Sequence, residues 1–128
     1  MELLLATRNP AKIETFRTLL GGIGAELRTL AQYPHLTPYP EDEPTFEANA
    51  IGKATWYARA TGLPALADDG GLEIEVLDGW PGVHSRRIFG DGRAATDDEM
   101  IAEVLRRMEG IPEKHRGCRM RNVLAFVA

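Results

Sequence analysis

Cysteine and histidine are scarce in this chain: Cys118 is the single cysteine, and histidine occurs three times in 128 residues. One thiol cannot form an internal disulfide, so the sequence excludes a disulfide-stabilised scaffold and fits the reducing cytoplasm. We expect Cys118 to be a small buried hydrophobe. Three scattered histidines and one cysteine also provide no cluster of the ligands that zinc prefers. We therefore expect a cytoplasmic protein without a zinc site of the usual kind.

Long apolar runs and an excess of positive charge are missing too. No run approaches the roughly 20 apolar residues that span a bilayer, and the opening Met-Glu-Leu-Leu-Leu-Ala lacks the basic residues of a signal peptide. Lysine and arginine number 15 against 19 aspartates and glutamates, for a net charge of −4. Proteins that bind DNA or RNA without sequence preference carry a basic excess. The composition therefore predicts neither a membrane protein nor a partner made of nucleic acid.

What the chain does have is the composition of a globular domain, with 44% hydrophobic and 27% charged residues. Its length is enough for one core, and we expect one domain over residues 1–128. Apolar runs and alternations predict strands at residues 2–6, 25–30, 64–67, 71–77 and 116–127. Capping and stop residues predict three helices, which begin near Pro10, Thr45 and Thr96. In the third helix the spacing predicts an inward face of Ile101, Val104, Leu105 and Met108.

The most informative segment is Ala-Leu-Ala-Asp-Asp-Gly-Gly-Leu at residues 65–72. Adjacent carboxylates at the end of an apolar strand repel each other, and partial burial disfavours their charged form. A divalent cation offsets that cost, and oxygen ligands suit Mg²⁺. Asp68 and Asp69 are therefore candidates for a metal site. Two acids before Gly-Gly are equally typical of a solvated turn.

A second candidate site lies where the first strand leads into the first helix. Asn9 is a good N-cap, and Pro10 suits the first helical position. The free N–H groups and the positive end of the helix dipole attract anions, and Lys12 adds a mobile positive charge. The alternative is that Asn9 only caps the helix and that Lys12 is a surface residue. Too few glycines are present for a P-loop or a dinucleotide fingerprint.

Three further groups could take part in such a site. One of the acids Glu41-Asp42-Glu43, in a proline-rich loop at residues 31–44, could reach a metal at Asp69, although acids also favour a helix start. Lys53, inside the second helix, could bind phosphate or lie on a solvated face. The paired arginines Arg86-Arg87 have the shape that suits phosphate oxygens.

The order and spacing of these segments carry a resemblance. The chain has Thr-x-Asn-x-x-Lys after its first strand, then an acidic loop, Thr-Phe-Glu-Ala-Asn-Ala-x-x-Lys-Ala (45–54), Ala-Asp-Asp-Gly-Gly-Leu (67–72) and Pro-Gly-Val-His-Ser-Arg-Arg (81–87). From residue 2 to residue 128 it resembles the inosine triphosphate pyrophosphatase (Ham1-like) family. The resemblance implies an α/β fold, with a mixed twisted central sheet flanked by helices and two lobes that enclose a cleft.

The resemblance also implies an activity. Enzymes of this family remove non-canonical purine nucleotides by hydrolysing ITP, dITP or XTP to the monophosphate and pyrophosphate. They require Mg²⁺ and are usually homodimers. We therefore expect a purine nucleoside triphosphate as substrate, Mg²⁺ as cofactor and a second copy of the chain as partner.

Site residues follow by position in the matching motifs. Asp69 would bind the metal and act as general base on the attacking water, with Asp68 assisting. Glu41 would be the second metal ligand, with Glu43 as the less favoured choice. The residues implied in substrate binding are Thr7, Arg8, Asn9, Pro10, Ala11, Lys12, Lys53, Gly70 and Arg87. This assignment requires the acidic pair and the amino-terminal anion site to lie at one place.

The chain departs from the family pattern in two ways. The family usually has Asp-Asp-Ser-Gly, and Gly70 lacks the serine hydroxyl. The chain is also shorter, and the later Phe-Gly-x-Asp and Ser-His-Arg motifs that recognise the base have no counterpart. We therefore expect an incomplete domain, truncated on its C-terminal side, whose open sheet edges are covered in an oligomer. The alternative function is a catalytically weak nucleotide- or phosphate-binding or oligomerising short form. A related pyrophosphatase for modified pyrimidine nucleotides fits the spacings less well.

Overall fold

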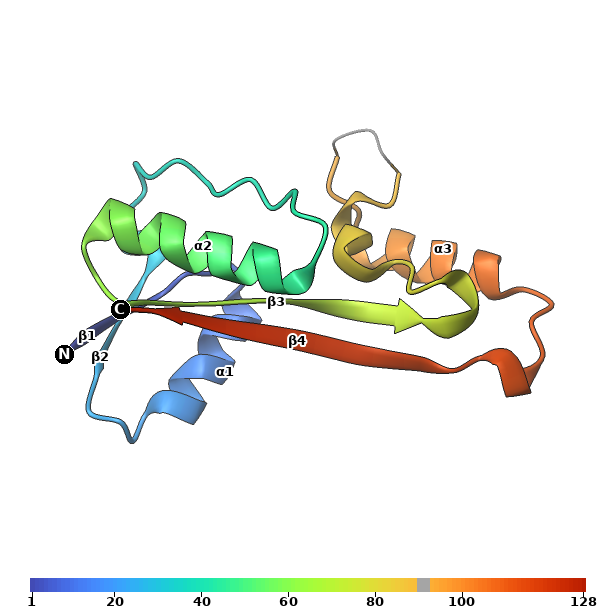
Figure 1. Cartoon of the computed structure of the whole chain (residues 1–128), viewed down its shortest axis with the longest axis horizontal. Coiled ribbons are helices and arrows are strands. Elements are labelled where there is room, and N and C mark those ends of the chain that lie inside the picture. Colours follow the sequence, from blue (N-terminus) through green and yellow to red (C-terminus); the bar gives the residue numbers. More distant parts are fainter. Residues whose placement is uncertain (90–92) are drawn as a thin grey trace. The chain divides into compact units, whose positions relative to one another are not determined.

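The computed structural model describes residues 1–89 and 93–128, apart from the side chain of Arg86 (Figure 1). The strands are β1 (Glu2–Leu5), β2 (Glu26–Thr29), β3 (Ala65–Ile74) and β4 (Cys118–Val127), and the α-helices are α1 (Pro10–Leu20), α2 (Phe46–Thr61) and α3 (Asp97–Met108). Short 3-10 turns occupy Leu30–Gln32, Glu75–Leu77, Gly82–Arg87 and Glu113–His115. None of the helices in these described residues has both the length and the apolar composition that crossing a bilayer requires.

The four strands form one sheet in the order β2-β1-β3-β4. Strand β1 pairs in parallel with β2 and with β3, whereas Figure 1 shows β4 running opposite to β3. The predicted α/β class with a mixed central sheet is therefore confirmed. The chain divides into two compact units, residues 1–69 with 123–128 and residues 70–122.

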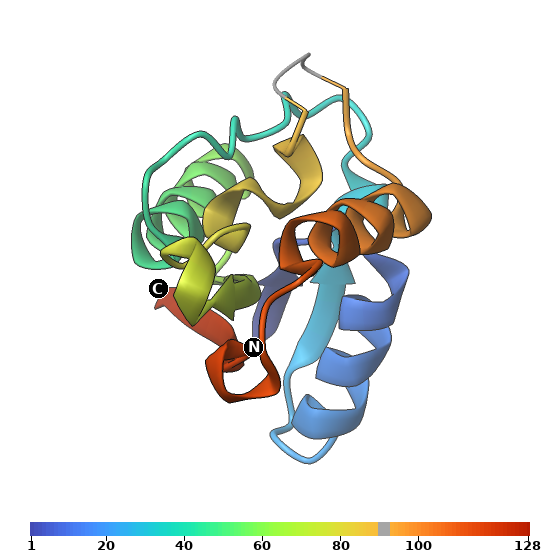
Figure 2. The same ribbon diagram turned by 90° about the vertical axis from the view of Figure 1, so that its right-hand side faces the viewer.

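In the first unit, helices α1 and α2 lie on opposite faces of the sheet (Figures 1 and 2). Alanines at the contact allow α2 to approach the strands closely, because they have almost no side chain to separate the two backbones. The core beneath α2 consists of Leu4, Ala6, Leu30, Ala50, Ala54, Tyr57, Ala65, Ala67 and Ala125.

The helix boundaries follow the capping signals of the sequence. The Asn9 side chain accepts a hydrogen bond from the N–H of Ala11 at 2.9 Å, and Pro10 opens α1. Helix α2 has Thr45 as its N-cap and ends at Gly62, whose φ of 74° favours glycine. These predictions are confirmed. Helix ends can be predicted from sequence because capping depends on a few adjacent residues.

The predicted turn at residues 68–71 is wrong, because β3 continues through both aspartates and both glycines to Ile74. A Cβ atom on Gly70 would lie 2.4 Å from the carbonyl oxygen of Arg121 and 2.6 Å from Oδ1 of Asn122. No side chain fits in that gap. Glycine at position 70 therefore permits a close approach of β4 and does not form a turn.

The second unit contains α3, which begins with the predicted capping box. The N–H of Glu99 donates to Oγ1 of Thr96 at 3.2 Å, and the N–H of Thr96 donates to the Glu99 carboxylate at 3.1 Å. The predicted inward face is only partly correct: Met108 is buried, but Ile101 and Leu105 are exposed. The spacing of apolar residues indicates which face of a helix is apolar. That face is buried only where another element packs on it.

Cys118 is also exposed, contrary to the prediction of a buried thiol. It opens β4, and the first three residues of that strand are all exposed. The small apolar side chain therefore has no core to enter at this end of the strand.

Candidate active site

The structure brings the two candidate sites together within the first unit. Strands β1 and β3 are parallel neighbours with Leu5 opposite Leu66, so the residues that follow Leu5 and Leu66 meet at one edge of the sheet. There Nζ of Lys12 lies 2.9 Å from Oδ2 of Asp68. The Asp68 side chain is only 3% exposed, and a buried carboxylate needs such a counter-charge. Asp68 and the start of α1 therefore lie at one place, as the assignment requires, and the roles of these residues stay predictions.

Asn9 caps the helix that carries Lys12. Its Oδ1 accepts from the N–H groups of Ala11 and Lys12 at 2.9 and 3.4 Å, and its own N–H donates to Oγ1 of the buried Thr7 at 3.2 Å. Pro10 has no N–H to offer. The first donors of α1 are thus already bonded within the chain. An anion at this end of α1 would be held by the Lys12 ammonium and the helix dipole, or would displace the Asn9 side chain.

Lys53 is buried rather than solvated. Its Nζ donates to the carbonyl oxygen of Asp68 at 3.0 Å and forms an ion pair with the carboxylate of Glu41. A buried ammonium is costly unless it is paired and hydrogen-bonded. The Lys53 ammonium, which α2 carries, therefore contacts both the acidic loop and β3.

Asp69 is half-buried beside these groups. Burial raises the pKa of its carboxyl above the ordinary value, and the negative charge of Glu41 acts in the same direction. A hydrogen bond from Asn49 and the charges of Lys53 and Lys12 lower that pKa, but the net shift is upward. A carboxylate in this setting is a stronger base than one in water.

Asn49 belongs to the site, although sequence reasoning assigned it no role. Its side chain is 1% exposed and bonds both the N–H and the C=O of Glu43, at 3.0 and 3.2 Å. The signal was present in the helical spacing, because Asn49 and Lys53 interrupt the apolar face of α2 at positions one turn apart. A polar residue on a buried face needs a partner, which marks it as a site candidate.

Comparison with known proteins decides the family. Residues 3–128 match the sequence profile of the Ham1 family. The chain belongs to the Ham1 family. It is 41% identical over 124 residues to a dITP/XTP pyrophosphatase of Geobacter sulfurreducens, covering 97% of this chain and 61% of that protein. It is 44% identical over 126 residues to a dITP/XTP pyrophosphatase of Thermus thermophilus, covering 98% and 59%.

Solved Ham1 structures share the fold. A HAM1 protein from Coxiella burnetii superposes with a TM-score of 0.86 at 36% identity, covering 98% of this chain and 62% of that one. A nucleoside-triphosphatase / dITP/XTP pyrophosphatase from Mycobacterium abscessus gives 0.83 at 36% identity, covering 99% and 65%. The chain therefore spans about three fifths of the length of the curated relatives that it matches.

The Ham1 site has a donor set that fits a magnesium ion. No three His, Cys, Asp or Glu side chains gather as a ready metal centre among residues 1–89 and 93–128. Glu41 and Asp69 supply hard oxygen donors, and the charge of Glu41 disfavours ionisation of Asp69. A cation between them would relieve that repulsion. Mg²⁺ is commonly held by one or two carboxylates, with waters and substrate phosphates as its other ligands.

Three further residues were predicted to contact the substrate. Arg8 is exposed on the loop between β1 and α1. Gly70 and Arg87 belong to the unit of residues 70–122, Gly70 within β3 and Arg87 exposed at the end of a 3-10 turn. Their roles in substrate binding stay predictions.

Proposed function

We propose that this Ham1 chain hydrolyses the non-canonical purine nucleoside triphosphates ITP, dITP and XTP to the monophosphate and pyrophosphate, and so clears them from the nucleotide pool. The observation that carries the proposal is the convergence of Lys12, Glu41, Lys53, Asp68 and Asp69 in the first unit. Two ammonium groups beside three carboxylates suit a polyphosphate that binds with a cation. The name dITP/XTP pyrophosphatase of the relatives supports the same substrates.

Phosphate binding falls to the two lysines and the start of α1. Lys12 is 36% exposed in its side chain and reaches solvent, so it can move from Asp68 to a phosphate oxygen. Lys53 is buried and held by the carbonyl of Asp68, so it supplies a stationary charge. Together with the dipole of α1, they would stabilise the pyrophosphate as it leaves.

Asp69 is the proposed general base. A water oxygen forms a bond to the α-phosphorus, and the bond from that phosphorus to the bridging α–β oxygen breaks, which releases pyrophosphate. The proton of the attacking water passes to the Asp69 carboxylate, which is suited to accept it because burial raises its pKa. Asp68 keeps Lys12 near this reaction centre until substrate binds.

Glu41 and Asp69 are the proposed ligands of Mg²⁺, with Glu43 as the less favoured alternative to Glu41. When bound, the ion would neutralise charge on the phosphate oxygens. Glu41 is paired with Lys53 in the structure, so its carboxylate already lies beside the site and needs only a change of partner.

We further propose that the chain works as a homodimer in the cytoplasm, with the nucleotide and not a polymeric nucleic acid as its partner. An exposed free thiol such as Cys118 persists most readily in a reducing compartment. The net charge of −4 disfavours binding to DNA or RNA.

The test of the activity is pyrophosphate release from ITP, XTP, GTP and ATP with Mg²⁺, for the wild type and Asp69→Asn. We expect turnover of ITP and XTP, and a loss of at least about 100-fold in the variant, because general-base catalysis contributes about 10²–10⁴. A matched control is Asp42→Asn, which removes a carboxylate of the same loop that is not among the proposed metal ligands Glu41, Glu43 and Asp69. Full activity of Asp69→Asn would contradict the proposed role of Asp69.

A second candidate function is a binding module with little or no catalysis. The chain spans 59–62% of the length of three dITP/XTP pyrophosphatases that it matches, so their activity is a proposal for this chain and binding without turnover is the alternative to it. ITP binding by calorimetry without pyrophosphate release would support this candidate over the first. Equal rates with ATP and ITP would instead indicate that the chain hydrolyses triphosphates without selecting the base.

A further inference from the structure

Two polar side chains occupy the buried face of α2, one helical turn apart. Asn49 is 1% exposed and Lys53 is 8% exposed, on a face otherwise formed by residues such as Ala50, Ala54 and Tyr57. Polar groups at such positions disfavour folding unless their hydrogen bonds are satisfied. The hydrogen-bond partners of Asn49 and Lys53 therefore explain why these polar residues occupy a buried face.

Asn49 contacts the acidic loop and β3 at the same time. Its Oδ1 accepts from the N–H of Glu43 at 3.0 Å, and its Nδ2 donates to the C=O of Glu43 at 3.2 Å. The same amide hydrogen-bonds the carboxylate of Asp69. A carboxamide has two donor hydrogens and one acceptor oxygen, so a single asparagine can make all three bonds.

Lys53 repeats this arrangement one turn further along α2. Its ammonium pairs with the carboxylate of Glu41 and donates to the C=O of Asp68 at 3.0 Å. Residues at i and i+4 lie one above the other on a helix. Helix α2 thus connects the loop at residues 41–43 to residues 68–69 of β3 twice, through Asn49 and, one turn later, through Lys53.

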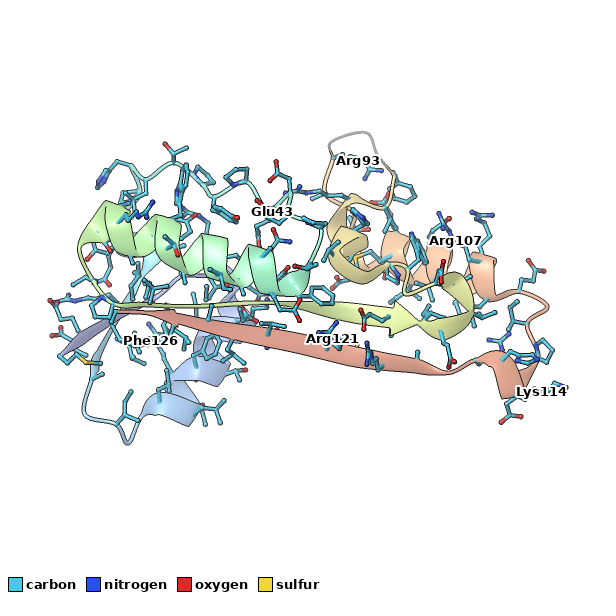
Figure 3. All side chains as sticks on the ribbon, in the orientation of Figure 1. Glu43, Arg93, Arg107, Lys114, Arg121 and Phe126 are labelled. Atoms are coloured by element: carbon cyan, nitrogen blue, oxygen red, sulfur yellow. The ribbon has the colours of Figure 1, made fainter. Side chains whose placement is uncertain are left out.

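We propose that Asn49 is a positioning residue, whose hydrogen bonds to Glu43 and Asp69 set the separation between the carboxylates of Glu41 and Asp69. Glu41 is two residues from Glu43, so the backbone that Asn49 holds is the backbone that carries Glu41. Figure 3 shows Glu43 on the loop beside the first turns of α2. The inference rests on the proposed function for the purpose of the carboxylate pair, and on the hydrogen bonds of Asn49 for the geometry.

Other contacts hold a different part of the same loop. The N–H of Tyr39 donates to the hydroxyl of Tyr57 at 3.1 Å, and Nε1 of Trp56 donates to the C=O of Thr37 at 2.9 Å. These bonds secure residues 37–39. Removal of the Asn49 amide should therefore loosen the backbone at Glu43 and leave residues 37–39 in place, which provides an internal control.

The first test measures amide hydrogen exchange by NMR in Asn49→Leu and Asn49→Ala. Leucine keeps the shape of asparagine without its polar groups, so an effect common to both variants reports the lost hydrogen bonds and not the lost volume. We expect the Glu43 amide to exchange roughly tenfold faster, as befits a lost hydrogen bond to a buried group, and the Tyr39 amide to keep its rate. Unchanged exchange at Glu43 would overturn the inference.

The second test measures the Mg²⁺ requirement. Loss of a residue that orients a metal ligand typically costs 10–100-fold in metal affinity or activity, so we expect the half-saturating Mg²⁺ concentration for ITP hydrolysis to rise at least about tenfold. The same weakening is expected when Mg²⁺ alone is titrated into the protein by calorimetry, a readout that does not depend on turnover.

The matched control is Thr61→Ala, at the other end of α2, where the Thr61 hydroxyl donates to the C=O of Tyr57 at 2.7 Å. This variant loses a helix contact without touching the loop, and it should keep the wild-type Glu43 exchange and Mg²⁺ requirement. An equal Mg²⁺ requirement in the wild type and both Asn49 variants would overturn the positioning role. A wild type that hydrolyses no triphosphate would instead overturn the proposed function.

Discussion

Asp69 carries a carboxylate whose surroundings disfavour its charge. Burial and then the charge of Glu41 raise its pKa, against a hydrogen bond from Asn49 and the charges of Lys53 and Lys12. A carboxyl with a raised pKa in the folded state favours folding below its unfolded pKa, and that contribution is lost as pH rises through the folded value. At neutral pH the ionised side chain therefore lowers the stability of the fold.

The replacement Asp69→Asn should consequently stabilise the protein at pH 7 while it slows turnover. We expect a rise of a few degrees in the midpoint of thermal unfolding, the scale on which about 1 kcal/mol acts in a domain of this size. The rise should shrink as the pH falls toward the ordinary carboxyl value of 3.8, where the wild-type group is protonated as well. A melting point at pH 7 below that of the wild type would refute this reading of the site.

Residue identities at the site were largely predictable, whereas their environments were not. Lys12, Glu41, Lys53 and Asp69 stand at recognisable positions in motifs of the sequence. The burial of Lys53 depends on how α2 packs on β3, which no local pattern encodes. Asn49 was missed for the same reason, because its partners at positions 43 and 69 lie on two other elements.

At the scale of elements, β3 illustrates how a distant strand decides local structure. Asp68-Asp69-Gly70-Gly71 has the composition of a turn, yet it lies within a strand of 10 residues. The explanation lies about 50 positions later, where the backbone of Arg121 and Asn122 leaves no space for a side chain at position 70. Helix ends were predictable because capping residues are adjacent in sequence. The extent of β3 was not predictable because it depends on a distant strand.

The replacement Gly70→Ala should therefore destabilise the pairing of β3 with β4. A new Cβ would lie 2.4 Å from the carbonyl oxygen of Arg121, and backbone cannot move away as easily as a flexible side chain. We expect a loss of about 1–3 kcal/mol, the usual cost of overpacking, measured by urea unfolding. Gly70→Ser, which restores the hydroxyl usual in the family, should carry the same steric cost.

The control for this experiment is Gly22→Ala, because nothing lies within 4 Å of a Cβ at position 22. That variant should unfold at nearly the wild-type urea concentration. Equal unfolding midpoints for Gly70→Ala and Gly22→Ala would show that β4 does not approach Gly70 as the structure describes.

At the scale of the whole molecule, exposed apolar side chains predict self-association. Leu124 is 55% exposed and Phe126 is 57% exposed on β4, the last strand in the sheet order. Ala125 between them packs in the core under α2, so Phe126 points to the opposite face of the sheet (Figure 3). An outer strand with an apolar face is a common site of association.

We expect sedimentation velocity to show an oligomer whose dissociation constant rises at least about tenfold in Phe126→Lys, because a buried charge at an interface is strongly unfavourable. Leu19→Lys is the matched control, since Leu19 is 71% exposed on α1 and not on β4. A wild type that remains monomeric at high concentration would contradict the expectation of a homodimer.

The pairing of Lys12 with Asp68 and of Lys53 with Glu41 has a consequence for anion binding. Both ammonium groups are already paired with carboxylates, so they are not free positive charges in the structure. A lone anion such as orthophosphate would have to compete with two carboxylates for its counter-ions. A divalent cation that binds the displaced carboxylates would lower the cost of that exchange, so we expect phosphate to bind more tightly when Mg²⁺ is present.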